Sequence, residues 1–148
     1  ITLHCDVRAG DFEHGGEASS RIKRALNRLR VDPQIVRRVA IATYELEINI
    51  VIHSTDGGEI IADILPDRIT IRAVDTGPGI PDVEQAMQPG FSTAPEWIRE
   101  MGFGAGMGLV NVRKCADEML IESPNKMWTS VKVVIYLRKQ PAESSGSE

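Results

Sequence analysis

The sequence is short of the features that mark several large classes of proteins. Its 148 residues include two cysteines, Cys5 and Cys115, which show no metal-ligand spacing and indicate a reducing compartment. It has no recognisable signal peptide and no apolar run near about 18 residues, so we expect a cytoplasmic protein that does not contact a membrane. A formal net charge of −4 gives no broad electrostatic basis for binding nucleic acid. Because the chain begins at Ile1 rather than at Met, we expect a processed or excised piece of a longer protein.

Common nucleotide-binding and catalytic motifs are also missing. The sequence has no GxxxxGKS/T P-loop, no GxGxxG after its first strand, no HExxH, and no HRD and DFG pair of a eukaryotic-type protein kinase. What remains is an ordinary globular composition, with 42% hydrophobic and 26% charged residues. A chain of this length favours one domain with enough buried surface for a core.

Hydrophobic periodicity predicts a domain over residues 1–139, followed by a disordered tail over 140–148 that lacks large apolar residues. Strands are expected over 1–9, 59–65, 68–74, 119–122 and 129–137, and helices over 17–30, 33–53, 81–87 and 107–119. Pro66 and Asp67 predict a tight hairpin between the second and third strands. Residues 89–106 form a long loop rich in Gly, Ser, Thr and Pro, and such a loop is usually functional or disordered.

The first expected helix carries apolar residues on one face and basic residues on the other. The basic residues are Arg21, Lys23, Arg24, Arg28 and Arg30. Two interpretations of this face stay open, namely a solvated surface and a docking surface for an acidic partner.

The second expected helix begins at Pro33, with Asp32 as its cap, and its second half is apolar nearly all round. Within this buried segment, Glu45, Asn49 and His53 are spaced four apart and share one face. The Asn49 carbonyl oxygen suits Mg²⁺, and Glu45, one turn earlier, lies where it would orient or deprotonate a nucleophile. The structural alternatives are a satisfied core amide for Asn49 and, for His53, a helix-end histidine that bonds to backbone.

Two glycine-rich stretches carry the other candidate residues. Asp75 follows an apolar strand and precedes Gly77 and Gly79, a pattern typical of a tight turn where backbone approaches a ligand. Residues 102–108 have glycine at every other position, which is typical of a loop that ends at a helix start, where free N–H groups meet phosphate. Our interpretation is that Asp75 reads a base and the glycine loop covers a polyphosphate. The alternative is that Asp75 only opens a turn.

Together these segments resemble the N, G1 and G2 boxes of the GHKL ATPases, at residues 45–49, 75–79 and 102–109. The acidic residue four positions before Asn49, the short chain and the lack of a dimerising phospho-acceptor helix pair make the chain similar to the anti-sigma branch. Within that branch it most resembles the RsbT-like switch kinases, on the stretches 41–43, 75–86, 90–93 and 117–123. The resemblance covers about residues 1–138. It implies the Bergerat fold, an α/β two-layer sandwich with helices on one face of a mixed, mostly antiparallel sheet.

The resemblance also implies ATP and Mg²⁺ as cofactors and assigns a role to each site residue. Asn49 would carry the Mg²⁺, and Glu45 would be the general base for the acceptor hydroxyl. Asp75 would bond the adenine amine, and Thr129 would support it through water. The other residues expected to bind the cofactor are Gly77, Gly79, Ile80, Gly102, Gly104, Ala105, Gly106, Met107, Gly108 and Leu109.

The function that the resemblance implies is an ATP- and Mg²⁺-dependent protein serine/threonine kinase of the anti-sigma or switch type. Its expected substrate is a Ser or Thr of a STAS-domain antagonist protein, and a homodimer stays open. One rival is a nucleotide-binding interaction module that sequesters a sigma factor or phosphatase with little turnover. The other is a histidine-kinase-type catalytic domain. Departures from the family pattern are the longer lid over 94–101, Trp128 in the place of a glycine, and Glu47 and Ile48 in the N box.

Overall fold

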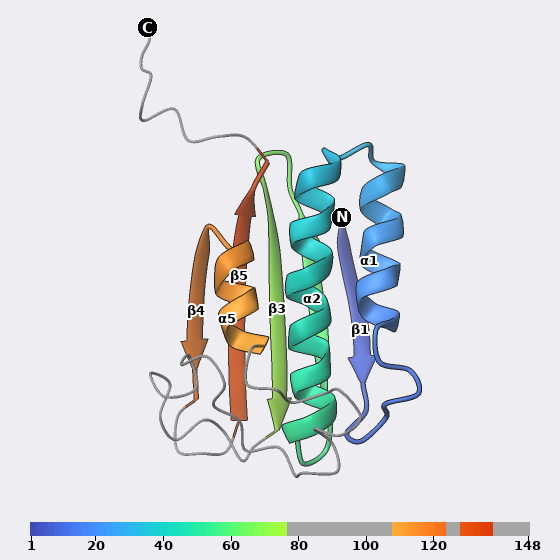
Figure 1. Ribbon diagram of the computed structural model, residues 1–148, viewed down its shortest axis with the longest axis vertical. Helices are drawn as coiled ribbons and strands as arrows, with labels where there is room; N and C mark the ends of the chain where they lie inside the picture. The colour runs from blue at the N-terminus through green and yellow to red at the C-terminus, as the bar shows by residue number, and fades with distance from the viewer. Residues whose placement is uncertain (77–107, 124–127, 138–148) are drawn as a thin grey trace, which may run out of the picture.

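A computed structural model describes residues 1–76, 108–123 and 128–137, in which a layer of helices covers one face of a sheet (Figure 1). In chain order the elements are β1 (Thr2–Val7), α1 (Glu17–Arg28), α2 (Pro33–His53), β2 (Gly58–Ile64), β3 (Arg68–Thr76), α5 (Gly108–Cys115), β4 (Glu118–Glu122) and β5 (Trp128–Tyr136). This arrangement confirms the expected two-layer α/β sandwich. The segments expected at 81–87, 89–106 and 140–148 lie outside the described residues.

The five strands form one sheet in the order β1-β2-β3-β5-β4, so the last strand lies between β3 and β4. Each of the four neighbouring pairs in the described residues is antiparallel, and the expectation was a mixed, mostly antiparallel sheet. The hairpin between β2 and β3 closes as predicted, because the Leu65 N–H donates to the Arg68 carbonyl at 2.9 Å. The topology therefore brings the ends of β3 and β5 side by side, although the two strands are far apart in the sequence.

Two element ends differ from their expected positions. β3 continues to Thr76, so Asp75 lies within the ladder rather than in the turn after it. Along the ladder, Asp75 pairs with Gly58 on one side and with Thr129 on the other. Helix α5 ends at Cys115 rather than near residue 119, because Glu118 already begins β4 and pairs with Val134 of β5.

The core lies between the helical layer and the sheet. Alternate strand residues face the helices, and Ile60, Ile71 and Val133 have no exposed surface. Leu26 of α1 and Val39 of α2 close the core from the other side and are also fully buried. α2 packs against both α1 and α5, so it forms the middle of the helical layer (Figure 1).

Helix α2 begins as its sequence predicts. The Asp32 carboxylate accepts a hydrogen bond from the Gln34 N–H at 2.8 Å, and Pro33 is the first helical residue. After the helix, Gly57 has a φ of 82°, and a side chain there would lie 2.5 Å from the Val7 carbonyl oxygen. Only glycine therefore fits the turn into β2. None of the helices in the described ranges combines the length and the apolar character that a bilayer-spanning segment needs.

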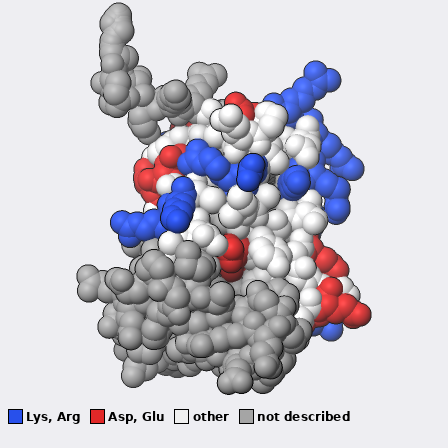
Figure 2. Space-filling model, viewed as in Figure 1, with Lys and Arg blue, Asp and Glu red and all other residues white. Residues whose placement is uncertain are grey.

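The helical layer carries a band of Lys and Arg side chains across its outer surface (Figure 2). The five basic residues expected on α1 and at its end are all exposed. Arg21 also makes local contacts, since its Nη1 donates to the His4 carbonyl at 2.9 Å and lies 3.5 Å from Cys5 Sγ. The exposure of this face is compatible with both interpretations, the solvated surface and the docking surface.

Candidate functional site

The start of α5 lies against the polar face of α2. Glu45 and Asn49 are half-buried on successive turns of α2. A methyl group added to Gly108, the first residue of α5, would lie 3.3 Å from Asn49 Oδ1 and 3.5 Å from Glu45 Oε1. Three of the predicted site residues, from two distant segments, therefore meet at one point. The first N–H groups of a helix have no partner within the helix, so this point offers donors beside a carboxylate and an amide.

Asn111 belongs to the same group, although the sequence alone does not single it out. Its side-chain amide Nδ2 donates to Glu45 Oε2 at 3.0 Å. The available signal is its spacing, since residues 108 and 111 lie on one face of α5, and Asn111 is a polar residue between the buried Leu109 and Val112. Glu45 is thus held by α5 as well as by its own helix.

Asp75 and Thr129 form the second part of the candidate site. They are direct cross-strand neighbours at the adjoining ends of β3 and β5. Both face the helical layer, because Ala73 and Val131, two residues away on the same strands, are core residues. Burial raises the pKa of the Asp75 carboxyl to about 6. A half-buried carboxyl group that faces the helical layer can accept one directed hydrogen bond from a ligand.

His53 and Trp128 lie at the borders of this region. His53 is the last residue of α2, as predicted, and burial lowers its pKa, so the ring is neutral at neutral pH. Trp128 is 38% exposed and precedes the buried Thr129 in β5. Successive strand residues point to opposite faces, so Trp128 projects from the face opposite α1, α2 and α5. Among the described residues, the Trp128 side chain therefore lies on the opposite face of the sheet from the Asp75 side chain.

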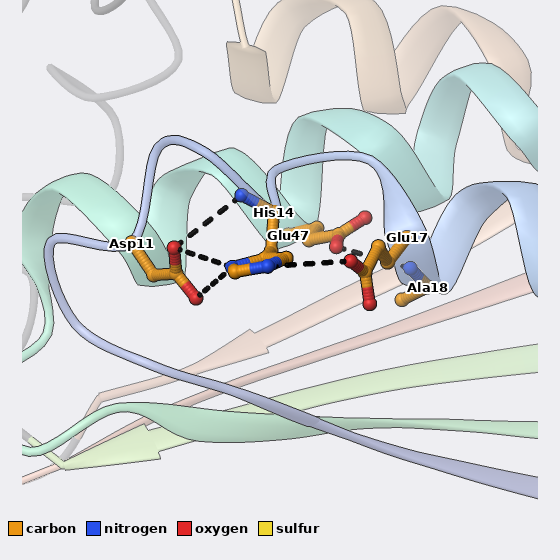
Figure 3. Close-up of polar contacts among 5 residues, drawn as sticks. All are labelled: Asp11, His14, Glu17, Ala18 and Glu47. Carbon is orange, nitrogen blue, oxygen red and sulfur yellow. Dashed lines mark hydrogen bonds and ion pairs between the residues drawn. The ribbon is translucent and has the colours of Figure 1, made fainter.

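Glu47 has a different environment from Glu45, because its side chain lies against the first turn of α1 (Figure 3). Its carboxylate accepts from the backbone N–H of Ala18 at 3.1 Å and of Ser19 at 3.2 Å, and the residue is 2% exposed. The residue at the N-cap of α1 is Gly16, which has no side chain to cap the helix. Glu47 supplies that cap from α2, and its negative charge also suits the positive end of the helix dipole.

The loop before α1 is held by a separate polar group (Figure 3). His14 Nδ1 lies 2.9 Å from both carboxylate oxygens of Asp11, and His14 Nε2 lies 3.9 Å from Glu17. The hydrogen bond raises the pKa of His14 and lowers that of Asp11. These residues organise the approach to α1 and are not among the predicted site residues.

The remaining predicted site residues lie outside the described ranges. They are Gly77, Gly79, Ile80, Gly102, Gly104, Ala105, Gly106 and Met107. Among the described ones, Leu109 is buried and directly follows Gly108 on α5. The described part of the site therefore consists of the α2–α5 corner and the Asp75–Thr129 pair.

Comparisons with known proteins bear on the fold and the family of the chain. An anti-sigma F factor of Caldanaerobacter subterraneus subsp. tengcongensis is 36% identical over 114 residues, which cover 73% of this chain and 76% of that protein. The serine/threonine-protein kinase RsbT of Bacillus subtilis is 34% identical over 104 residues, covering 68% of this chain and 72% of RsbT. A solved structure of the RsbU and RsbW domains of a Mycobacterium tuberculosis protein matches with a TM-score of 0.62 at 15% identity. That match covers 90% of this chain but 32% of the longer one, and it supports the fold alone.

A family model described as the histidine kinase-like ATPase domain matches residues 9–134. The matched range contains α1, α2 and α5, together with Asp75 and Thr129. An ATPase domain implies that the chain binds ATP. Because the match includes both parts of the candidate site and most of the sequence, this chain belongs to the histidine kinase-like ATPase family.

Proposed function

We propose that this chain is an ATP- and Mg²⁺-dependent protein serine/threonine kinase that phosphorylates a Ser or Thr of a STAS-domain antagonist protein. The observation that carries the proposal is the α2–α5 corner, where Gly108 lies against Asn49 and Glu45. This corner combines a helix N-terminus, a hard oxygen donor and a carboxylate. A phosphoryl transfer needs these three elements to hold phosphate, to hold a metal and to accept a proton.

The donor set at the corner fits Mg²⁺. The Asn49 amide oxygen is a hard oxygen ligand, and Mg²⁺ is usually held by one or two protein oxygens together with water and substrate phosphates. Asn49 would hold the ion at its Oδ1, next to the start of α5. When bound, the ion would supply positive charge against the β- and γ-phosphates.

In the proposed reaction Glu45 accepts the proton of the acceptor hydroxyl. The hydroxyl oxygen forms a bond to the γ-phosphorus as the bond from the γ-phosphorus to the β–γ bridging oxygen breaks, and ADP leaves. The N–H groups at the start of α5 stabilise the charge on the transferred group. The proton thus ends on Glu45, and the phosphoryl group ends on the acceptor.

Asp75 would recognise the nucleotide base. Its carboxylate would accept a hydrogen bond from the adenine amine, and the neighbouring Thr129 would support it through water. The helix-facing position of both side chains and the partial burial of Asp75 support this role. Gly77, Gly79 and Ile80 would line the base, and the residues at 102–107 would cover the phosphates.

The nucleotide site is tested by calorimetric titration of ATP and ADP, with and without Mg²⁺, on the wild type and on Asn49→Ala. We expect Mg²⁺ to strengthen nucleotide binding only when Asn49 is present. Asn27→Ala is the matched control, because Asn27 is an exposed asparagine on α1. Binding that Mg²⁺ strengthens equally in Asn49→Ala would contradict the assignment of Asn49.

Phosphoryl transfer is tested with Mg-ATP and the STAS-domain proteins of the source genome, each purified separately. Intact-mass measurement should show the addition of one phosphate to one of them, located on a Ser or Thr. A chain that binds Mg-ATP but modifies none of them would overturn the substrate class and not the nucleotide site.

The names of the anti-sigma F relatives favour a second candidate, the sequestration of a sigma factor. In that function the nucleotide holds the fold of the binding surface and turnover is low. The two candidates differ in their dependence on the base, since Glu45→Ala should leave sequestration intact and abolish transfer.

A further inference from the structure

Helix α5 is tied to α2 by polar contacts near its middle and at its C-terminal end. At its C-terminal end, Arg38 Nε donates to the Cys115 carbonyl at 2.9 Å, and Arg38 Nη2 lies 3.0 Å from Asp117 Oδ1. Nearer its N-terminal end, Asn111 Nδ2 donates to Glu45 Oε2 at 3.0 Å. Val112, between these contacts, is fully buried. α5 is therefore a fixed support beside Glu45.

The contact with Asn111 distinguishes the two oxygens of Glu45. Oε2 accepts the amide, whereas Oε1 lies on the side of Gly108, 3.5 Å from the position of an added methyl group. The terminal torsion of a glutamate is broad and roughly two-fold, so the chain does not by itself set the plane of the carboxylate. A hydrogen bond to one oxygen does set that plane, and it directs the other oxygen toward the start of α5.

A neutral amide is well suited to this task. An Arg or Lys at the same place would stabilise the ionised carboxylate and weaken it as a proton acceptor. An amide N–H orients the carboxylate with a smaller effect on its basicity. Asn111 is also held firmly in place, because the end of its helix at Cys115, and Asp117 just after it, both bond to Arg38.

We propose that Asn111 is a positioning residue for Glu45, which fixes the carboxylate so that Oε1 faces the acceptor hydroxyl. This inference rests on the proposed kinase function. It adds Asn111 to the residues that act in the reaction. The orientation of the Glu45 carboxylate would then depend on α5, the helix that begins at Gly108.

The test measures phosphoryl transfer from Mg-ATP to the STAS-domain acceptor and, in its absence, to water as released phosphate. Asn111→Leu removes the donor at nearly constant size. We expect kcat to fall about 10- to 100-fold, as for other small misplacements of a catalytic group, while the KM for ATP stays within about twofold. Asn27→Leu makes the same substitution at an exposed site on α1 and should leave kcat unchanged.

A second background separates positioning from a general structural effect. In Glu45→Gln the base is absent, so adding Asn111→Leu should cause no further loss of kcat. If Asn111→Leu does not fold, Asn111→Asp replaces the donor with a carboxylate of the same shape and should lower kcat in the same way.

The other outcomes separate a failure of the positioning role from a failure of the kinase function. If Asn111→Leu has the same kcat as the wild type, the positioning role is wrong and the kinase function still stands. Equal losses in the wild-type and Glu45→Gln backgrounds, or a change in KM alone, would also overturn the positioning role without touching the kinase function. No turnover by the wild-type chain, with either acceptor, would overturn the proposed function and this inference with it.

Discussion

Glu45 and Glu47 lie two residues apart on α2 and project from opposite sides of the helix, since each residue advances the helix by about 100°. Glu47 is 2% exposed, and its two oxygens accept two backbone N–H groups from the first turn of α1. Glu45 is half-buried and accepts one side-chain amide, from Asn111 on α5. The same side chain on the same helix thus caps a helix in one case and lines the candidate site in the other.

The difference shows that partners, more than residue type or spacing, decide which carboxylate is available for chemistry. The hydrogen bonds of Glu47 hold it in one place, and breaking them would leave the first N–H groups of α1 unsatisfied. Glu45 keeps an oxygen on the side of Gly108, where the start of another helix would provide donors for phosphate in the proposed function. We can therefore state how substitutions at the two positions should differ.

The largest expected effect is the loss of phosphoryl transfer in Glu45→Gln. Removal of a general base typically slows a reaction about 10²- to 10⁴-fold, whereas ADP affinity should stay within a few-fold, because the substitution keeps the shape of the side chain. Initial rates of acceptor phosphorylation measure this effect. Glu47→Gln is the control and should keep its rate per folded molecule. Similar rates for Glu45→Gln and the wild type would remove Glu45 from the mechanism.

The next effect concerns stability. Here Glu47→Gln should have the larger effect and Glu45→Gln the smaller one. Glu47→Gln replaces one acceptor oxygen with an amide group that faces a backbone N–H, so we expect the free energy of unfolding to fall by about 2–3 kcal/mol. Glu45→Gln should change it by less than about 1 kcal/mol, because its partner is a single half-buried side chain. Urea unfolding of the two variants measures both values. A larger loss in Glu45→Gln would contradict the capping role of Glu47.

Local features of the sequence predict much of the fold. The Asp32–Pro33 pair and the long apolar pattern predict α2 with the bounds that the structure shows, because capping and periodicity act within a few residues. The apolar alternation likewise predicts β3 from its first residue, Arg68, although the expected strand ends at residue 74. The N-box spacing predicts that Glu45 and Asn49 lie on one face of α2.

The contacts that distinguish the two glutamates could not be predicted in this way. Glu47 meets Ala18 across 29 residues of sequence, and Asn111 meets Glu45 across 66. Both contacts depend on how separate helices dock, and neither residue type specifies its partner. The extension of β3 past Asp75 is also a tertiary effect, since it requires β2 and β5 on either side.

A smaller effect tests Asp75 through pH. Burial raises its pKa to about 6 from an ordinary value of 3.8. The protonated form is thus favoured by folding, so its contribution to stability is present below about pH 4 and is lost as the pH rises through about 6. Nucleotide binding should show the opposite trend, because the adenine amine needs the ionised carboxylate. We expect ADP affinity to fall about tenfold between about pH 7 and pH 5.

Asp75→Asn is the reference for this measurement. The nucleotide's own titration is common to both proteins, so the ratio of their affinities isolates Asp75. We expect Asp75→Asn to bind ADP more weakly than the wild type at about pH 7. Its ADP affinity should not show the roughly tenfold fall between about pH 7 and pH 5 that protonation of Asp75 causes in the wild type. A ratio that stays constant over this range would mean that Asp75 does not contact the base.

The smallest effect concerns Gly108, which lies against the side chains of both Asn49 and Glu45. In Gly108→Ala the new methyl group would lie 3.3 Å from Asn49 Oδ1, so the Asn49 amide must move by a few tenths of an ångström. Displacing a side chain from its rotamer costs about 0.5–1 kcal/mol, which predicts a loss of about two- to fivefold in the Mg²⁺-dependent part of ADP affinity. Affinity without Mg²⁺ should not change, and the free energy of unfolding should stay equal or rise, because alanine favours a helix more than glycine does. If ADP affinity instead fell equally with and without Mg²⁺, the methyl group would be obstructing the phosphates directly, and Asn49 would not be the residue that holds the ion.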